Sequence, residues 1–431
     1  MTNTEVAKYT LDALKKAGAE HAQCIVSRGK VDELNVESND FSLLRSLFTS
    51  ALSIKALVGG KKGSTGTNRL DTESIDRAVA DCIAAAESSV ADEAEQIAPL
   101  TQNADFAAGI TEPDRDALFD RLQEFLTQTA GDYPKVTMEN VVAKYDQRDS
   151  LYANSNGAQF CYTRGKYGFY AGFCAQEGDL TSSSSGFGCA LETLDKPFLD
   201  IGIHKTLLED SEKQIVTVPF DGKTVGTVVL MPDCLGEFLE SIVYVLMRDG
   251  ALLDGTSPWK DSLGKAVAHP GFTLSTIPLH EQVVCGERFT ADGYACENAD
   301  LIRDGVLQGF QLTQYGANKT GLARAKNSAE NFAVTPGEKS LAEIIAGIDC
   351  GLLIGRFSGG YPSSNGDFSG VAKNSFLIKN GQIADAVSET MISGNLTQLL
   401  LEVSDISRET VTDGMHVLPW AAFKGVTISG K

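Results

Sequence analysis

The chain has 431 residues, of which 42% are hydrophobic and 22% are charged, as is usual for a water-soluble globular protein. This length exceeds what one hydrophobic core usually serves, so we expect two domains. The formal net charge of −20 repels phosphate backbones, and no run of Lys and Arg offsets it, so nucleic acid is not an expected partner. The sequence has no stretch of about 18 apolar residues that would predict a membrane-spanning helix.

The start of the chain and its cysteines indicate the compartment. Residues 1–5 lead directly into an amphipathic pattern, whereas a secretory signal begins with a basic and then an apolar segment. The nine cysteines are scattered and include no CxxC pair, which favours reduced, mostly buried thiols and argues against a zinc ribbon. We therefore expect a cytoplasmic protein with no membrane partner.

Helices and strands alternate in the prediction for the first 135 residues. The spacing of apolar residues predicts a helix over residues 4–17, which Gly18 ends. Strands are predicted over residues 22–27, 31–37 and 50–58, and a glycine-rich turn follows at 59–63. A second helix is predicted from the Asp71 cap to about residue 88, and a third from Pro113 and Asp114.

Residues 135–203 are predicted to form strands and turns. The pattern indicates a turn at 152–157, an aromatic-rich hairpin over 162–173 and a flexible polar tip at 181–186. Residues 218–223 are typical of a junction, so we place a domain boundary near residue 215. The first predicted domain is thus an α/β domain over residues 1–215, with a mixed sheet and flanking helices.

The second half is predicted to be rich in strands. A buried strand over residues 227–231 leads into a helix that Pro232 and Asp233 begin and that runs to about residue 249, with one continuous apolar face. After Gly250 only residues 340–348 are predicted to be helical. The expected class is α+β, with a β-rich, barrel-like C-terminal domain over residues 216–431 that contains one principal helix.

Residues 356–381 carry the most informative pattern, two strands joined by a glycine-containing exposed loop. Three segments in or near it, at 359–360, 366–369 and 376–381, resemble the C-terminal signature of the TldD/PmbA (TldE) family, known as modulators of DNA gyrase and as peptidases. Further matches to the family pattern lie at residues 154–157, 291–298, 301–305 and 315–321. The resemblance covers most of the chain and is strongest after residue 289.

The catalytic member of that family, TldD, carries an HExxxH zinc motif on a helix and a further cysteine ligand near its C-terminus. In this chain the corresponding positions are Gly236, Glu237 and Ser241, and no cysteine follows Cys350. Zinc needs imidazoles or thiolates at about 2.0 to 2.3 Å and a carboxylate to activate the bound water. We therefore expect no metal and no catalytic residue here, and interpret Glu237 as a solvent-facing helix residue. The resemblance is to the PmbA/TldE side of the family, the zinc-free partner or paralogue.

A second set of residues could imitate the zinc motif. His280, Glu281 and Cys285 stand at the same offsets as HExxxH. Pro278 and the β-branched pair at 283–284 predict an extended segment, in which residues five apart point to opposite faces. An independent zinc metallopeptidase that uses these residues, or His269 with nearby acids, remains the alternative enzyme hypothesis.

Backbone is the expected binding surface. Glycine-lined strand edges can accept an extended peptide as an added strand, which reads main chain rather than side chains. The candidate substrate-binding residues lie in the 356–381 pattern, and the alternative interpretation is that its glycines only serve tight turns; the candidates are Gly359, Gly360, Gly366, Asp367 and Phe368.

The resemblance implies a function. A PmbA/TldE-like chain is expected to form a homodimer, or a heterodimer with a TldD-type zinc peptidase, that encloses a cleft for small unfolded peptides. Zinc is then expected only in the TldD-type partner, and the family's role is the processing or degradation of small flexible peptides and proteins. A stand-alone regulatory module that captures an extended partner is the alternative binding hypothesis.

Overall fold

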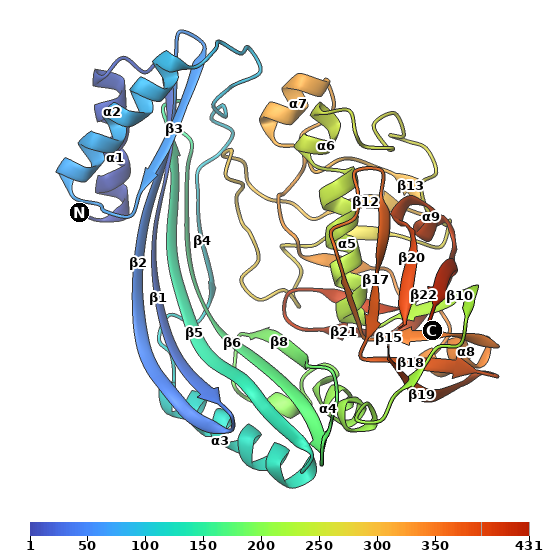
Figure 1. Ribbon diagram of the computed structural model, residues 1–431. Helices are drawn as coiled ribbons and strands as arrows, with labels where there is room; N and C mark the ends of the chain where they lie inside the picture. Colours follow the sequence, from blue (N-terminus) through green and yellow to red (C-terminus); the bar gives the residue numbers. More distant parts are fainter. Residues whose placement is uncertain (389, 431) are drawn as a thin grey trace.

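The computed structural model describes residues 1–388 and 390–430, and its strands form two large sheets. The strands of the first sheet end at Leu191, and those of the second begin at Val218. Figure 1 shows the long strands of the first sheet curving around one side of the second half. The protein is a mixed α+β structure, as predicted, and its sheets are curled.

The first sheet has the order β3-β2-β1-β5-β6-β4, and β7 and β8 also pair with β6. Neighbouring strands are antiparallel except β4, which runs parallel to β6. Four strands of 17 to 19 residues form its middle. The bounds are β1 (His21–Glu37), β2 (Asp40–Val58), β3 (Lys61–Thr67), β4 (Ala104–Gly109), β5 (Val136–Asn154), β6 (Gln159–Glu177), β7 (Leu180–Thr181) and β8 (Ser185–Leu191).

The predicted N-terminal helices are confirmed as α1 (Asn3–Lys16), α2 (Thr72–Ser88) and α3 (Arg115–Asp132). Side chains cap their first turns: the hydroxyl of Thr2 and the carboxylates of Asp71 and Asp114 accept hydrogen bonds from backbone N–H groups. The three helices cover the outer, convex face of the sheet in Figure 1. Their apolar sides complete two cores, one beneath α1 and α2 and the other beneath α3.

Two sequence predictions in this half were wrong in the same way. The strands predicted at 22–27 and 31–37 are one strand, β1, and the hairpin predicted at 162–173 lies within the single strand β6. The glycines that suggested turns allow close approach instead: a Cβ on Gly165 would lie 1.7 Å from the Ile110 carbonyl oxygen. The polar tip predicted at 181–186 is also shorter, because β8 begins at Ser185.

A short connection links the sheets through a 3₁₀ turn (Phe198–Asp200) and α4 (His204–Lys213). The second sheet has the order β13-β12-β11-β14-β22-β10-β15-β18-β19-β9, with β22 near its centre. β21 also pairs with β22. A branch leaves the sheet at β22, where β20 pairs with β22, β17 with β20 and β16 with β17. The bounds are β9 (Val218–Pro219), β10 (Lys223–Leu230), β11 (Leu274–Thr276), β12 (Ala299–Arg303), β13 (Val306–Leu307), β14 (Phe332–Val334), β15 (Cys350–Ile354), β16 (Arg356–Gly359), β17 (Asp367–Lys373), β18 (Ser375–Lys379), β19 (Gln382–Ser388), β20 (Met391–Asn395), β21 (Val403–Thr412) and β22 (Val417–Ser429).

The principal helix of the second half is α5 (Pro232–Leu246), which packs on β22. Its predicted apolar face is confirmed, with Leu235, Leu239 and Ile242 each no more than 1% exposed. The helix ends three residues earlier than predicted, and α6 (Asp249–Leu253) follows at once. The described residues contain no helix long and apolar enough to cross a membrane.

Three short helices were missed by the sequence prediction, which gave only residues 340–348 as helical after Gly250. That one is confirmed as α8 (Leu341–Ala346), and the missed ones are α6, α7 (Gln314–Thr320) and α9 (Leu396–Leu401). Helices of five to seven residues show no apolar period. They are held by local hydrogen bonds instead, as where Asp249 accepts the Thr313 N–H at the start of α7.

The two halves contact each other through the segment between β11 and β12. Phe289 stacks on Phe160 of β6 with ring centroids 5.7 Å apart, and the Tyr162 hydroxyl donates to the Gly286 carbonyl at 3.0 Å. The side-chain amide of Gln23 in β1 donates to the Ala291 carbonyl at 3.1 Å. The second half is thus fixed against the concave side of the first sheet.

Candidate functional site

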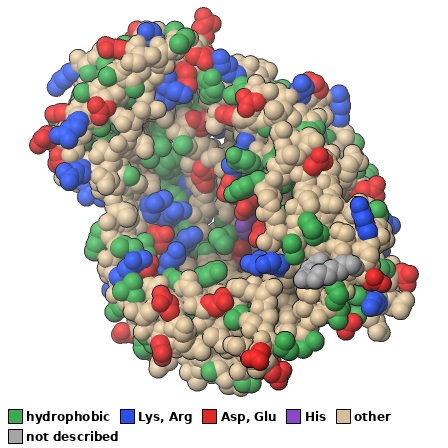
Figure 2. All heavy atoms as spheres, in the orientation of Figure 1, with side chains coloured by type: hydrophobic (Ala, Val, Ile, Leu, Met, Phe, Trp, Pro, Cys, Tyr) green, Lys and Arg blue, Asp and Glu red, His purple; other side chains and the backbone are tan. Residues whose placement is uncertain are grey.

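A hollow of about 470 Å³, here called the α5 hollow, lies between α5 and the end of β16. Glu237 and Ser241 line it from α5, and Gly359, Gly360 and Phe368 line it from β16, the following loop and β17. The fold therefore brings together two groups of predicted site residues that are more than 100 positions apart in the sequence. Figure 2 shows the molecule hollowed between its two halves, with charged side chains around the opening.

Three aromatic rings form the apolar floor of this hollow. Phe238 lies edge-on to Phe357 and to Phe368, with ring centroids 5.2 Å apart in each pair. Gly359 and Gly370 face each other across β16 and β17, and a Cβ on either would lie 2.6 Å from Cζ of Phe357. These two glycines leave room for the Phe357 ring.

Of the other predicted binding residues, Gly360 lines the α5 hollow and Gly366 and Asp367 lie outside it. Gly360 has open space where a Cβ would project, so its backbone is accessible from the α5 hollow. Gly366 has φ +92° and serves a tight turn, while Asp367 accepts hydrogen bonds from the amides of Asn365 and Asn395. The Asn395 amide holds the pKa of Asp367 below its usual value. Gly366 and Asp367 do not line the α5 hollow.

One edge of β16 has no strand beside it in the described part of the chain, since β16 pairs only with β17. The Ala372 N–H of β17 donates away from β16, to Thr390, and Ala372 is the partner of Phe357. Alternation along an antiparallel pair then turns the backbone groups of Phe357 and Gly359 away from β17. At Phe357 this edge meets Cys234 of α5, and at Gly359 it opens on the α5 hollow.

The outer face of α5 also borders a smaller hollow of about 190 Å³, which we call the acidic hollow; its lining includes Asp233, Gly236, Glu237, Glu240, Asp413 and His416. Removal of water from around the carboxylate raises the pKa of Glu237 to about 7, with Arg356 opposing and Asp233 and Glu240 adding to the shift. The same desolvation raises the pKa of Asp233 to about 6. Asp233 and Glu237 are both exposed residues, so Glu237 faces solvent from α5 as predicted, and it also lines both hollows.

The donors at the motif position do not fit the family's zinc site. Gly236 offers no ligand, and a Cβ added to it would lie 3.3 Å from Cδ1 of Leu418. His416 stands nearby, but its Nδ1 accepts the Phe332 N–H at 3.2 Å, which leaves the proton on Nε2. Within residues 1–388 and 390–430, no three His, Cys, Asp or Glu side chains are grouped as a metal site requires.

In the described residues, the alternative motif of His280, Glu281 and Cys285 is not grouped as a metal site requires either. The segment with His280 and Cys285 forms turns, so the prediction of an extended strand was wrong. The Nδ1 atom of His280 accepts the Gln282 N–H, and Cys285 is buried with its Sγ 3.6 Å from the Gly165 carbonyl oxygen. Cys285 has φ +56°, which turns the chain at this point. Burial raises the pKa of the Cys285 thiol.

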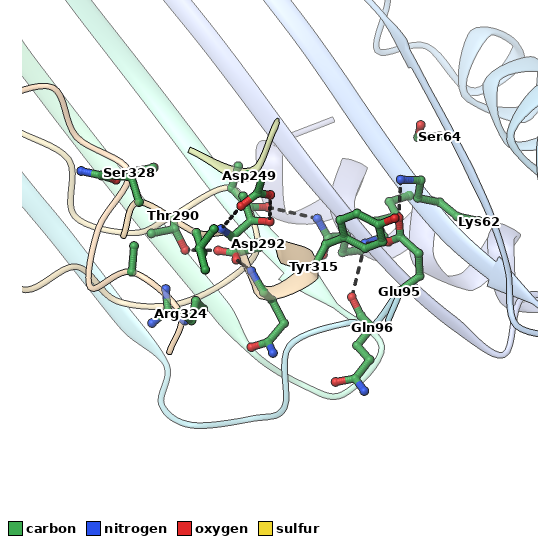
Figure 3. A pocket seen from close by; sticks show the side chains of 18 of the residues that line it. Lys62, Ser64, Glu95, Gln96, Asp249, Thr290, Asp292, Tyr315, Arg324 and Ser328 are labelled. Carbon is green, nitrogen blue, oxygen red and sulfur yellow. Dashed lines mark hydrogen bonds and ion pairs between the residues drawn. The ribbon is translucent and has the colours of Figure 1, made fainter. Parts of the chain in front are cut away.

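A polar cavity of about 410 Å³ lies where the two halves meet near α7 (Figure 3). Its charges are largely paired: Glu95 forms ion pairs with Lys55 and Lys62, and Asp292 accepts the Gln314 N–H at 2.8 Å. Beside it, Lys319 of α7 pairs with Asp92 at 2.8 Å. Because the Lys319–Asp92 ion pair joins the two halves, we interpret the cavity as part of the junction between them.

Comparison with known proteins agrees with this architecture. Residues 222–430 match the model of the PmbA/TldA metallopeptidase C-terminal domain, and residues 22–86 match that of the PmbA/TldA metallopeptidase domain 1. The chain belongs to the PmbA/TldD family. A metalloprotease PmbA homolog from Haemophilus influenzae is 25% identical over 92% of this chain and 89% of its own length.

Solved structures of similar proteins extend over the whole chain. TldE from Thermococcus kodakarensis has a TM-score of 0.82 at 18% identity, covering 99% of this chain and all of its own. A Bacteroides thetaiotaomicron protein, named for modulation of DNA gyrase, has a TM-score of 0.85 at 22% identity, covering 100% and 99% of the two chains. These structures share the fold of this PmbA/TldD family member.

Sequence reasoning missed the polar residues that surround Glu237. Asp233 was read only as a helix start, although it stands four positions before Glu237 and therefore on the same side of α5. Arg356 and Asn374 lie near both carboxylates, and Asn374 has φ +50° between β17 and β18. The spacing of Asp233 and Glu237 was visible in the sequence, whereas the position of Asn374 depends on how the strands pair.

Proposed function

We propose that this chain is a PmbA/TldE-type subunit of a TldD/TldE-type metallopeptidase system that processes small unfolded peptides, and that it does not itself hydrolyse them. The observation that carries the proposal is the composition of α5, where Gly236, Glu237 and Ser241 occupy the motif positions. A carboxylate without a metal ion cannot lower the pKa of a bound water. Zinc is therefore assigned to the TldD-type partner.

The α5 hollow supports the binding of an extended peptide. It combines an apolar floor of three phenylalanines with accessible backbone at Gly359 and Gly360. Backbone hydrogen bonds give affinity that does not depend on side chains, while an apolar floor accommodates large residues. Such a surface suits unfolded peptides of varied sequence.

The outer part of β2 supports the assignment of a partner subunit. β3 pairs with β2 only from Leu52 onward, so the edge of residues 40–51 has no neighbouring strand in the described chain. Five large apolar side chains on this edge are 39% to 75% exposed; they are Phe41, Leu43, Leu44, Leu47 and Phe48. An exposed apolar edge strand is a template for pairing with another chain. A second copy or a TldD-type subunit is the partner we propose for it.

All nine cysteines are free, including the exposed Cys350, which suits a reducing compartment. A cytoplasmic location is part of this proposal, and the free thiols support it.

Peptide cleavage tests the proposal. The purified chain, supplied with zinc, should bind a dye-labelled unfolded ten-residue peptide without cleaving it. Addition of a TldD-type zinc peptidase from the same genome should yield cleavage and a joint species in sedimentation. Hydrolysis by the chain alone that is lost on His280→Ala would replace this proposal with the independent peptidase. Peptide binding without any joint species would favour the stand-alone binding module.

A further inference from the structure

A fourth cavity, of about 240 Å³, lies at the start of β16, where the first sheet and the second half approach each other. We call it the Arg356 pocket. The first part of β8 and Tyr170 of β6 form one side, and α5, the start of β16 and the residue after β17 form the other. The side chains that carry the argument are Asp233, Glu237, Arg356 and Asn374.

Two residues that line this pocket each carry a buried polar atom without a hydrogen-bond partner, among four such atoms in the described residues; the two atoms are Nε of Arg356 and Oδ1 of Asn374. Asn374 is only 8% exposed. Its Nδ2 donates to Oε1 of Gln214 at 3.0 Å and to the Ser183 carbonyl at 3.4 Å, which fixes the orientation of the amide. A buried donor or acceptor without a partner is costly, so this pair of atoms calls for a ligand with matching groups.

Among the residues that line the pocket, Arg356 thus has one unpaired donor and Asn374 one unpaired acceptor, beside the carboxyl groups of Asp233 and Glu237. The Arg356 guanidinium carries one positive charge against the two carboxyl groups, and a bound cation would favour their deprotonated forms. The N-terminal residue of a peptide has the complementary groups. Its ammonium donates several hydrogen bonds, for Asn374 and the carboxylates, and its carbonyl oxygen accepts one from Nε of Arg356.

We propose that the Arg356 pocket holds the N-terminal residue of the bound peptide through the free α-ammonium group. The inference rests on the proposed peptide-binding function and adds the direction in which the peptide lies. Glu237 lines both the Arg356 pocket and the α5 hollow. A peptide whose first residue occupies the pocket therefore continues past Glu237 into the α5 hollow, where its backbone meets Gly359 and Gly360.

The test compares one unfolded ten-residue peptide, labelled at its C-terminal end, with the same peptide acetylated at its N-terminus. Acetylation removes the charge and two of the donors, so the full chain should bind the acetylated peptide about tenfold more weakly by fluorescence anisotropy. Equal affinity would overturn the inference and leave the proposed peptide binding intact. Failure of both peptides to bind would overturn both.

A pair of matched variants ties the effect to this pocket. Asp233→Asn keeps the size of the side chain and removes a carboxylate that lines it, so the preference for the free N-terminus should fall to less than about threefold. Asp261→Asn changes an exposed carboxylate outside the four cavities and should keep the full preference. An unchanged preference in a folded Asp233→Asn protein would assign the ammonium to another site.

Discussion

Two adjacent glycines of the α5 hollow differ in what surrounds them. A methyl group on Gly359 would lie 2.6 Å from the Phe357 ring and 2.7 Å from the Ser369 carbonyl oxygen, while one on Gly360 would meet nothing within 4 Å. We expect Gly359→Ala to lower the free energy of unfolding by about 1 to 3 kcal/mol, and Gly360→Ala to change it by less than about 0.5 kcal/mol. Urea denaturation of the two variants measures both values, and a reversed order would refute the packing described here.

Gly360 also provides a test of access to the hollow. Gly360→Val should fold normally but weaken peptide binding, because the branched side chain projects into the space that the peptide backbone is proposed to occupy. Unchanged binding in anisotropy measurements, together with normal thermal unfolding, would place the peptide elsewhere.

His204 is a structural histidine whose charge state is set by burial. Its ring stacks on Phe187 at 3.7 Å and its Nδ1 lies 2.6 Å from the Phe198 carbonyl oxygen. Desolvation lowers the pKa of His204 from 6.5 to about 4, so only the unfolded chain takes up the proton between these values. The stability that the neutral form contributes above pH 6.5 is lost as the pH falls, by about 3 kcal/mol near pH 4.

The variant His204→Phe isolates this effect, because phenylalanine keeps the stacking and does not titrate. Its free energy of unfolding should fall less steeply between pH 6.5 and 4 than that of the unsubstituted protein. Asp233 and Glu237 change stability in the opposite direction, since their raised pKa values favour the folded state at low pH, but they are the same in both proteins. Parallel pH curves from urea denaturation would show that His204 is charged in the folded state.

At the scale of elements, the unpaired edge of β2 leads to a prediction about how the chain associates. Leu44 and Phe48 are 74% and 75% exposed on a strand segment without a neighbour in the described chain. If the proposed dimer forms through this edge, the double substitution Leu44→Lys and Phe48→Lys should shift sedimentation to a 45.9 kDa species, because paired chains would bring the added charges together. Val90→Lys alters an exposed residue outside the sheets and serves as the control. A dimer that persists in the double variant would assign the interface to another surface.

The elements that were predictable from sequence have local causes. α1, α2 and α3 begin at Thr2, Asp71 and Asp114, where short polar side chains accept the first N–H groups of each helix. The long strands were divided in the prediction because glycine in a strand has the same local signal as glycine in a turn. Only the Ile110 carbonyl next to Gly165 reveals the difference, and that contact joins residues 55 positions apart.

At the scale of the whole molecule, the candidate site depends on contacts between the halves. The sequence indicated Glu237, Gly359 and Phe368 separately, each from the family resemblance. Their common hollow follows from α5 lying against β16, and the Arg356 pocket needs Tyr170 from the first sheet as well. Such pairings depend on the register of long-range strands, which no local pattern specifies.

The proposal assigns zinc chemistry to the partner subunit and peptide binding to this chain, and a substitution of Glu237 tests this assignment. If zinc and its activated water belong to the partner, Glu237→Gln in this chain should leave kcat of the reconstituted pair within about twofold, because no transition-state interaction is removed. KM should rise several-fold, since Glu237 lines both the pocket and the hollow that the peptide is proposed to occupy. Asp261→Asn, which neutralises an exposed carboxylate outside the cavities, provides the control with the same change of charge. A fall in kcat of about a thousandfold for Glu237→Gln, at unchanged KM, would instead make Glu237 a catalytic base of this chain.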